Sequence, residues 1–353
     1  MYDAIVIGTG PSGSITAKNL AENGFKTLVI DKHKLPRKKS CSGVLIKKSK
    51  MLVEKNFGKI PDNVTCSPQK TRGIIITNEI GKEFIFEDEG LNIWRDKFDY
   101  WLADQARLHG AELLESTSVV DFIEQNEYVS LKVKRNDAYD TIDGRLIIAC
   151  DGVNGISRKK LKTTESNYIV TYQAFYHGTG NFDSRYFYAF LSHELSEYDA
   201  WVNMKDDLLI LGVGVKKASH AKEYLNRLIE YLGDEYNLRL KEKISEEFWT
   251  LPIIIPDFKT VLSKGRIFFA GEAAGLINPM GEGISSAIAS GIALSKAVIN
   301  GYASYPDLNE REILEFYKNE MTLEIEHIKR QWVFLNQMSP TFWGKLVTDA
   351  QKC

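Results

Sequence analysis

Short apolar runs separated by amphipathic stretches mark the N-terminal part of the chain. Residues 4–7 (AIVI) form one run and residues 25–30 another, with a stretch of helical spacing between them that ends at Gly24. Strand, helix and strand of this size predict a βαβ unit. Two later apolar runs, residues 146–149 and 267–270, predict further buried strands.

A different pattern follows in the middle of the chain. Residues 73–87 and 168–215 alternate between apolar and polar positions and are rich in aromatic side chains. Such alternation is typical of half-buried strands, and we expect both stretches to join one sheet. Helical spacing is expected over residues 95–110 and 219–245, and from about 283 to 300.

These elements predict a mixed α/β and α+β fold. A Rossmann-like dinucleotide domain is interrupted by a β-sheet substrate domain, and the C-terminus is helical. Residues 32–50 are expected to be a basic loop and residues 112–149 to form β-hairpins. The dinucleotide domain is predicted over residues 1–60, 95–165 and 259–305, the substrate domain over 61–94 and 166–258, and the helical segment over 306–353.

Composition narrows the class of protein. Hydrophobic residues make up 44% and charged residues 26% of the chain, and the formal net charge is -2. A chain without an overall basic charge is not expected to bind nucleic acid. Cys41, Cys66, Cys150 and Cys353 are scattered without metal-ligand spacing, and the histidines do not cluster, so we expect neither a disulfide framework nor a metal site.

The N-terminus and the apolar runs bear on location. The chain enters a strand pattern at once, without a charged segment, apolar core and cleavage site, which favours a cytoplasmic protein. The longest apolar runs noted, residues 208–215 and 251–255, fall short of the roughly 18 residues that span a bilayer. We therefore expect no transmembrane segment, while peripheral contact with a membrane remains open.

The segment GTGPSG at residues 8–13 carries the clearest chemistry. It stands between a predicted strand and a predicted helix, and Asp31 ends the next strand. In such a motif Gly8 permits a tight turn, Gly10 lets the backbone approach a pyrophosphate, and Gly13 lets helix and strand pack closely. An acid at Asp31 fits a ribose without a 2′-phosphate, which favours FAD or NAD over NADP; a purely structural turn is the alternative.

Two later segments favour FAD over NAD. CDGVNGISR at residues 150–158 follows a buried strand, although taken alone it is compatible with a hairpin turn. A third segment, residues 265–284, runs from a strand into Gly271 and Glu272 and then to a long helix near Gly283. A carboxylate at this strand end can bind ribityl hydroxyls, and the helix N-terminus favours an anionic reduced flavin.

The three segments together resemble the p-hydroxybenzoate-hydroxylase-type FAD fold and, within it, the geranylgeranyl reductase family. The matching stretches are GTGPSG at 8–13, RDKFDYWL at 95–102, CDGVNGISR at 150–158 and GEAAGLINPMGEGISSAIASG at 271–291. The resemblance implies that Arg95 begins a helix reaching back to the cofactor. It also implies that Asp151 and Gly152 lie near the nucleotide, and that Glu272 takes a ribityl-binding position usually held by Asp.

Two further stretches match the family in part. The loop at residues 36–44 (PRKKSCSGV) resembles its Lys-x-Cys-Gly-Gly segment beside the flavin, with Ser42 in place of a Gly. Cys41 is either a thiol close to the flavin or a small loop residue. In the segment 198–205 (YDAWVNMK), Trp201 matches an aromatic cavity signature whose Phe-Pro end is absent. Cys41 and Trp201 are the candidate catalytic residues.

The residues expected to bind FAD are Gly8, Gly10, Pro11, Ser12, Gly13, Asp31, Lys32, Cys41, Ser42, Gly43, Arg95, Asp151, Gly152, Gly271, Glu272, Gly281, Gly283 and Ile284.

The expected activity is that of an FAD-dependent oxidoreductase. By the resemblance, reduced flavin passes a hydride to a C=C bond of an apolar, isoprenoid-like small molecule. The flavin is reduced by an external electron donor, either NAD(P)H or a ferredoxin-like protein. A flavin-dependent monooxygenase on the same scaffold and a redox-responsive flavoprotein without turnover are the alternatives. A halogenase is disfavoured because the Trp-x-Trp-x-Ile-Pro signature of that group is absent.

Overall fold

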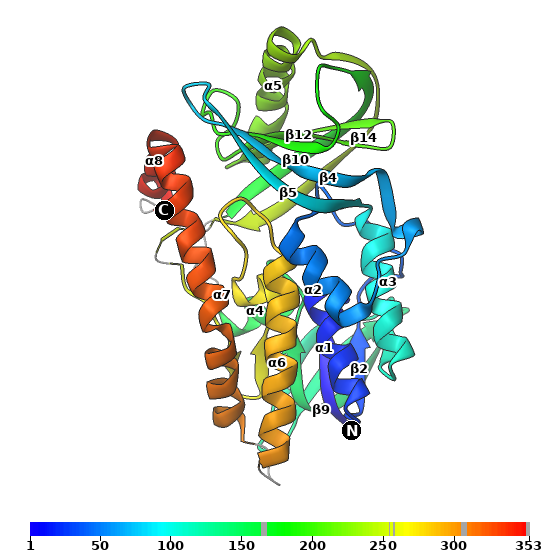
Figure 1. Cartoon of the computed structure of the whole chain (residues 1–353). Coiled ribbons are helices and arrows are strands. Elements are labelled where there is room, and N and C mark those ends of the chain that lie inside the picture. Colours follow the sequence, from blue (N-terminus) through cyan, green and yellow to red (C-terminus); the bar gives the residue numbers. More distant parts are fainter. Residues whose placement is uncertain (164–167, 254, 257, 305–308, 351–353) are drawn as a thin grey trace.

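Two sheets and a set of long helices make up the fold. A computed structural model describes residues 1–163, 168–253, 255–256, 258–304 and 309–350. Cys353 and parts of the predicted domains and of the C-terminal segment lie outside these ranges. In Figure 1 the first sheet and its helices form the lower part of the molecule, and the second sheet forms the upper part.

The first sheet is mainly parallel. Its spatial order is β15 (Ser263–Lys264), β16 (Ile267–Phe269), β9 (Ala138–Ala149), β1 (Tyr2–Ile7), β2 (Thr27–Ile30) and β6 (Glu112–Leu114). β7 (Ser118–Glu124) and β8 (Val129–Arg135) continue it antiparallel from β9. This arrangement confirms the predicted βαβ unit and the two later buried strands.

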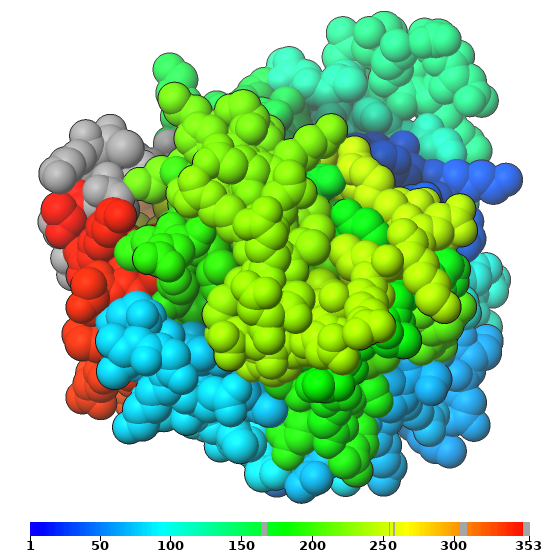
Figure 2. Space-filling model, turned by 90° about the horizontal axis from the view of Figure 1, so that it is seen from above, coloured from blue at the N-terminus to red at the C-terminus, as the bar shows by residue number. Residues whose placement is uncertain are grey.

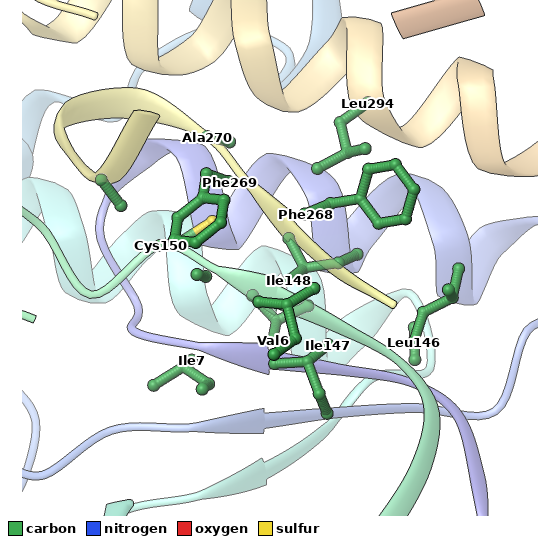
Figure 3. Packing of buried hydrophobic residues seen from close by; sticks show 14 of the residues in the cluster. Val6, Ile7, Leu146, Ile147, Ile148, Cys150, Phe268, Phe269, Ala270 and Leu294 are labelled. Carbon is green, nitrogen blue, oxygen red and sulfur yellow. The ribbon is translucent and has the colours of Figure 1, made fainter. Parts of the chain in front are cut away.

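Continuous apolar runs explain why these strands lie at the centre. Ile5, Ile147 and Ile148 are fully buried, because helices or loops cover both faces of a parallel sheet. Figure 3 shows strand residues such as Val6 and Ile148 packing with Phe268 and with Leu294 of the helix above them. The carboxyl ends of β1, β9 and β16 therefore reach the same edge of the sheet.

Helices flank the first sheet. They are α1 (Pro11–Glu22), α3 (Arg95–Leu108), the short α4 (Ile156–Leu161), α6 (Ile284–Ser304) and α7 (Glu310–Met338). α6 packs against α1 on one side and α7 on the other, as Figure 1 shows. α1, α3 and α6 lie where the sequence predicts them.

The second sheet is mostly antiparallel and joins the two alternating stretches, as predicted. Its spatial order is β14 (Arg239–Pro252), β10 (Tyr168–Thr179), β13 (Leu208–Val215), β12 (Ala200–Lys205), β11 (Tyr186–Phe190), β4 (Thr65–Thr77), β5 (Glu83–Ile93) and β3 (Val44–Leu45). α5 (Ala221–Tyr236) covers its outer face, and Figure 2 shows residues of α5 and β14 across the top of the molecule, with α8 (Pro340–Ala350) at its edge.

Two predictions about elements are wrong. The predicted helix over residues 219–245 ends at Tyr236, where Asn237 adopts a left-handed conformation, and β14 begins at Arg239. β14 is an edge strand with many charged residues, and its pairing with β10 outweighs their helical propensity. The predicted loop over residues 32–50 contains β3 and the start of α2 (Lys47–Phe57), which buries Ser49, Val53 and Phe57.

The two C-terminal helices join the two parts of the protein. The hydroxyl of Tyr317 on α7 donates to the carbonyl of Phe269 at 2.9 Å, in the first sheet. α8 (Pro340–Ala350) buries Phe342 and Trp343 against side chains of the second sheet. The C-terminal segment predicted to be helical, residues 306–353, therefore packs against the rest of the fold at the residues that the structure describes.

The prediction that no apolar segment is long enough to span a bilayer did not take α6 into account. Residues 284–303 form a helix long and apolar enough to cross a membrane by length and composition, with a mean hydropathy of 1.2. Of this stretch, 72% is buried inside the protein, as expected for the core helix of a globular domain.

Contact between α1 and α6 depends on Gly291. A Cβ atom there would lie 2.4 Å from Ile15 Cγ2 and 2.7 Å from the Ser12 carbonyl oxygen. We expect Gly291→Ala to lower the free energy of unfolding by about 1–3 kcal/mol, because the helices must separate to admit the methyl group. Urea unfolding followed by circular dichroism measures this change.

The matched control is Gly233→Ala on α5, where a Cβ would meet nothing within 4 Å. There the substitution should stabilise the protein by roughly 0.5–1 kcal/mol through helix propensity. Equal effects of the two substitutions would contradict the tight packing at Gly291.

Candidate functional site

The turn between β1 and α1 is shaped by close backbone contacts. A Cβ on Gly8, whose φ is +102°, would lie 2.5 Å from the Cys150 carbonyl oxygen, and one on Gly13 would lie 2.0 Å from the Gly8 oxygen. A Cβ on Gly10 would meet only Arg37, at 3.9 Å. The turn therefore packs tightly against the sheet at Gly8 and Gly13 but leaves free space at Gly10. α1 begins at this open side, where the free backbone amides of its first turn can bind an anion.

Asp31 lies at the end of β2 beside this turn. Its carboxylate accepts hydrogen bonds from the Thr9 amide at 3.0 Å and the His33 amide at 2.9 Å, and it is paired with Arg37 at 3.3 Å. Burial opposes its ionisation, but the charge of Arg37 and these hydrogen bonds outweigh burial and lower its pKa. Asp31 is thus a charged group at the predicted ribose position, and its neighbour Lys32 is exposed.

Arg37 is a candidate that the sequence did not single out. Its guanidinium pairs with Asp31 and with Asp99 of α3, both at 3.3 Å, and lies over the open turn at Gly10. A guanidinium in this place can bind phosphate oxygens. The only sequence signal was its membership in the basic stretch after β2.

Arg95 is buried at the start of α3. It makes two hydrogen bonds to Asp99, at 2.9 and 3.0 Å. Burial disfavours its charge, but the pairing with Asp99 outweighs burial and raises the pKa of Arg95. Cys41 also contributes to this rise in the pKa of Arg95, and its sulfur accepts the Gly43 amide at 3.3 Å. The predicted loop and the predicted helix start therefore line the same pocket.

The loop at residues 39–43 is also held by the second sheet. Asn203 of β12 donates its side-chain amide to the Ser42 carbonyl at 3.2 Å. The buried ammonium of Lys205 donates to the Ile93 carbonyl at 2.7 Å and lies close to Gly43. Contacts from β12 thus hold the segment that carries Cys41.

The second predicted segment lies next to the third. The carboxyl of Asp151 accepts the Ser157 amide at 3.0 Å, and burial raises its pKa. A Cβ on Gly152 would lie 3.7 Å from a carboxylate oxygen of Glu272. Arg158 donates to the Glu272 carbonyl at 3.0 Å. The strand ends of β9 and β16 therefore bring both segments together, with Asp151 capping α4.

The third segment lies against the first. The Gly271 amide donates to the Ser290 hydroxyl at 2.9 Å, and a Cβ on Gly271 would lie 2.9 Å from the Ser12 hydroxyl. The Glu272 side chain is 3.8 Å from the Lys39 ammonium. Gly281 and Gly283 then lead into α6, so that three parts of the chain far apart in sequence meet at one edge of the first sheet.

One pocket joins this edge to the second sheet. The space inside it is about 850 Å³ and includes volume that is open to solvent. Of the predicted site residues it is lined by Pro11, Cys41, Ser42, Arg95, Trp201, Glu272, Gly281, Gly283 and Ile284. The other predicted residues, Gly8, Gly10, Ser12, Gly13, Asp31, Lys32, Gly43, Asp151, Gly152 and Gly271, do not line the pocket.

Several lining residues were missed by the sequence reasoning. Trp249 and Leu251 of β14 and Phe187 of β11 add an apolar wall beside Trp201. The ammonium of Lys39 lies 3.7 Å from the centre of the Trp249 ring. Burial lowers the pKa of Lys39, and the nearby charge of Glu272 only partly offsets this effect. Trp249 lies beyond the helix predicted over residues 219–245, and no motif in the sequence marked it.

The indole N–H groups of Trp201 and Trp249 are buried and have no hydrogen-bond partner within the described ranges. They are donors that a bound molecule can satisfy. With the open turn at Gly10, these unsatisfied donors fit a site built for a ligand that extends from the turn into the pocket.

Neither a metal cluster nor a disulfide is found where the structure describes the chain. No group of three His, Cys, Asp or Glu residues in this part of the chain has the arrangement of a metal site. Cys41, Cys66 and Cys150 are free thiols.

Comparisons with known proteins bear on the cofactor and the family. The model of the FAD binding domain family matches residues 1–202. A digeranylgeranylglycerophospholipid reductase from Thermoplasma acidophilum is 26% identical over 311 residues, which cover 82% of this chain and 76% of that protein. These findings confirm the predicted FAD and the resemblance to geranylgeranyl reductases.

Solved structures show the same fold. A geranylgeranyl bacteriochlorophyll reductase-like protein from Thermoplasma acidophilum has a TM-score of 0.82 at 23% identity, over 98% of this chain and 90% of that one. The flavin-dependent halogenase CmlS has a TM-score of 0.77 at 20% identity, over 97% of this chain and 66% of that one. Because the family model covers more than half of the chain, the protein belongs to the FAD binding domain family and is an FAD-dependent oxidoreductase.

Proposed function

We propose that the protein reduces C=C bonds of an apolar, isoprenoid-like substrate. The observation that carries this proposal is a pocket lined by Arg95 and Glu272 and by apolar side chains that include Trp201 and Trp249. A hydrocarbon chain fits such a wall, since apolar lining with a few polar groups binds and orients apolar molecules. The named activity of the Thermoplasma acidophilum relative supports the same substrate class.

We assign FAD to the groove that begins at the open turn. Gly10 leaves room for the pyrophosphate at the N-terminus of α1, Arg37 lies over that position, and Asp31 is placed for the adenosine ribose. Glu272 lies at the strand end suited to the ribityl hydroxyls. The N-terminus of α6 at Ile284 lines the pocket, and its dipole stabilises negative charge on a bound ring.

The protein's contribution is positioning and exclusion of water. Reduced flavin supplies the hydride when it is bound. Trp201, Trp249 and Phe187 shield the pocket and hold the substrate against the cofactor side. Cys41 and Arg95 both line this pocket, which keeps Cys41 a candidate for a thiol close to the ring. The electrons come from an external donor, NAD(P)H or a ferredoxin-like protein.

The assignment of the pyrophosphate predicts the behaviour of Gly10→Val. The backbone at Gly10 has φ −69° and ψ 177°, which valine adopts easily, and the side chain meets only Arg37, so the protein should fold. FAD should be lost, because the isopropyl group fills the phosphate position. The ratio of flavin absorbance to protein measures the loss, and a yellow variant with full FAD content would contradict the assignment.

Arg37→Ala should weaken FAD binding by about 1.5–3 kcal/mol, roughly 10- to 100-fold in Kd, through the loss of a charge-assisted hydrogen bond. The control is Lys38→Ala, because Lys38 is the exposed neighbour of Arg37 in the same basic loop. Titration of flavin into the apoproteins gives both constants. The same affinity in the two variants would exclude a phosphate contact by Arg37.

The reductase activity is tested with anaerobic protein reduced by dithionite and a geranylgeranyl lipid as substrate. Mass spectrometry should show the gain of two hydrogen atoms for each double bond reduced, with reoxidation of an equivalent amount of flavin. Oxygen consumption that depends on substrate and yields a hydroxylated product would instead support a monooxygenase. Flavin that cycles without changing any olefin or aromatic compound would contradict both enzymatic assignments.

A further inference from the structure

A buried carboxyl group on the second sheet lines the pocket and has no part in binding the cofactor as assigned above. Asp199 precedes β12 and is 7% exposed. Its main chain is fixed, since its carbonyl accepts the Ser196 hydroxyl at 2.7 Å and the Gly214 amide at 2.8 Å. Its side chain lines the pocket together with Tyr198 and Trp201.

The carboxyl of Asp199 is not paired with a cation. In the described part of the chain, no hydrogen bond from another residue reaches its two oxygens, and no ion pair involves it. The other titratable or charged groups that line the pocket are Tyr198, Lys39, Cys41, Arg95 and Glu272. Lys39 is paired with Glu272 and Arg95 with Asp99, so neither cation neutralises Asp199.

Burial without a partner favours the neutral acid. It raises the pKa of Asp199 to about 7, because the charged form loses its hydration and gains no compensating charge. Asp199 is therefore mainly protonated below about pH 7 and becomes a carboxylate as the pH rises through that value. Glu272, the other acid in the pocket, is already engaged with Lys39.

We propose that Asp199 is the proton donor for reduction of the substrate double bond. The proposal rests on the proposed reductase function. The O–H bond of Asp199 breaks and its proton forms a C–H bond at one olefinic carbon. The other carbon takes a hydride, with its electron pair, from reduced flavin supplied by the external donor. The alkene is reduced, the flavin is oxidised, and the Asp199 carboxylate takes up a proton from water before the next turnover.

The general acid should account for a large part of the rate. In Asp199→Asn, FAD stoichiometry and flavin reduction by dithionite should be unchanged, since Asp199 lies on the wall formed by the second sheet. Turnover of a geranylgeranyl lipid should fall at least ~100-fold, the usual contribution of a positioned acid. Asp199→Glu, which keeps the acid, should retain part of the turnover. In the wild-type protein, turnover should decline as the pH rises through about 7.

Infrared spectroscopy gives a readout that does not depend on turnover. At pH 6 the oxidised holoprotein should show a neutral-acid carbonyl stretch that belongs to Asp199 and disappears above pH 8. Bands from Asp151 and Glu282, whose pKa values burial also raises, are common to all the variants and are removed by subtracting their spectra. The band should be absent in Asp199→Asn. It should persist in Asp207→Asn, the matched control, because Asp207 is exposed in the turn after β12.

The outcomes separate this proposal from the proposed function. An active wild type with an inactive Asn variant and a lost band supports Asp199 as the donor. Full turnover by the Asn variant, or a wild type without the band, overturns the role of Asp199 and leaves the reductase assignment intact. A wild type that shows the band yet reduces no prenyl double bond overturns the reductase function and the role of Asp199 with it.

Discussion

Close approach of the backbone at the edge of the first sheet is the constraint on which the rest of the structure depends. Gly8 and Gly13 pack the turn and α1 against β9 with no room for a side chain, and Gly291 brings α6 onto α1. Because these elements are so close, Gly271 reaches Ser12 and Glu272 reaches the same edge. The open side of the turn at Gly10 is what remains for a ligand.

The spacing of apolar residues correctly predicted those strands and helices whose burial requires a regular pattern within a short stretch of sequence. The apolar runs of β1, β9 and β16 and the helical spacing of α3 and α6 are strong signals, because burial on both faces or along one stripe requires them. The glycine turn was found because close approach of backbone to backbone requires glycines at fixed spacing between a strand and a helix. The predicted domain boundaries and the roles of the site residues stay predictions.

Signals that depend on tertiary partners were missed. Residues 239–245 read as a helix because their charged side chains favour one, whereas pairing with β10 makes them an edge strand. Trp249 lies on that strand, four residues beyond the predicted helix, and carried no signal of its own. The basic stretch with Arg37 and Lys39 was interpreted mainly as a solvated loop, although it belongs to the segment that resembles the family's loop beside the flavin. Nothing in the sequence shows that these two side chains fold back onto Asp31 and Glu272. An unpaired acid such as Asp199 is equally invisible, because the absence of a partner is a property of the folded chain.

The C-terminal helices α7 and α8 hold the two sheets together beside the pocket. Tyr317 fastens one end of this pair to the first sheet, and Trp343 packs against Tyr198 at the wall of the pocket, with ring centres 6.0 Å apart. A hinge that swung the two sheets apart would have to break this buried aromatic contact. The wall of the pocket at Tyr198 is therefore held in place by a helix more than a hundred residues away in the sequence.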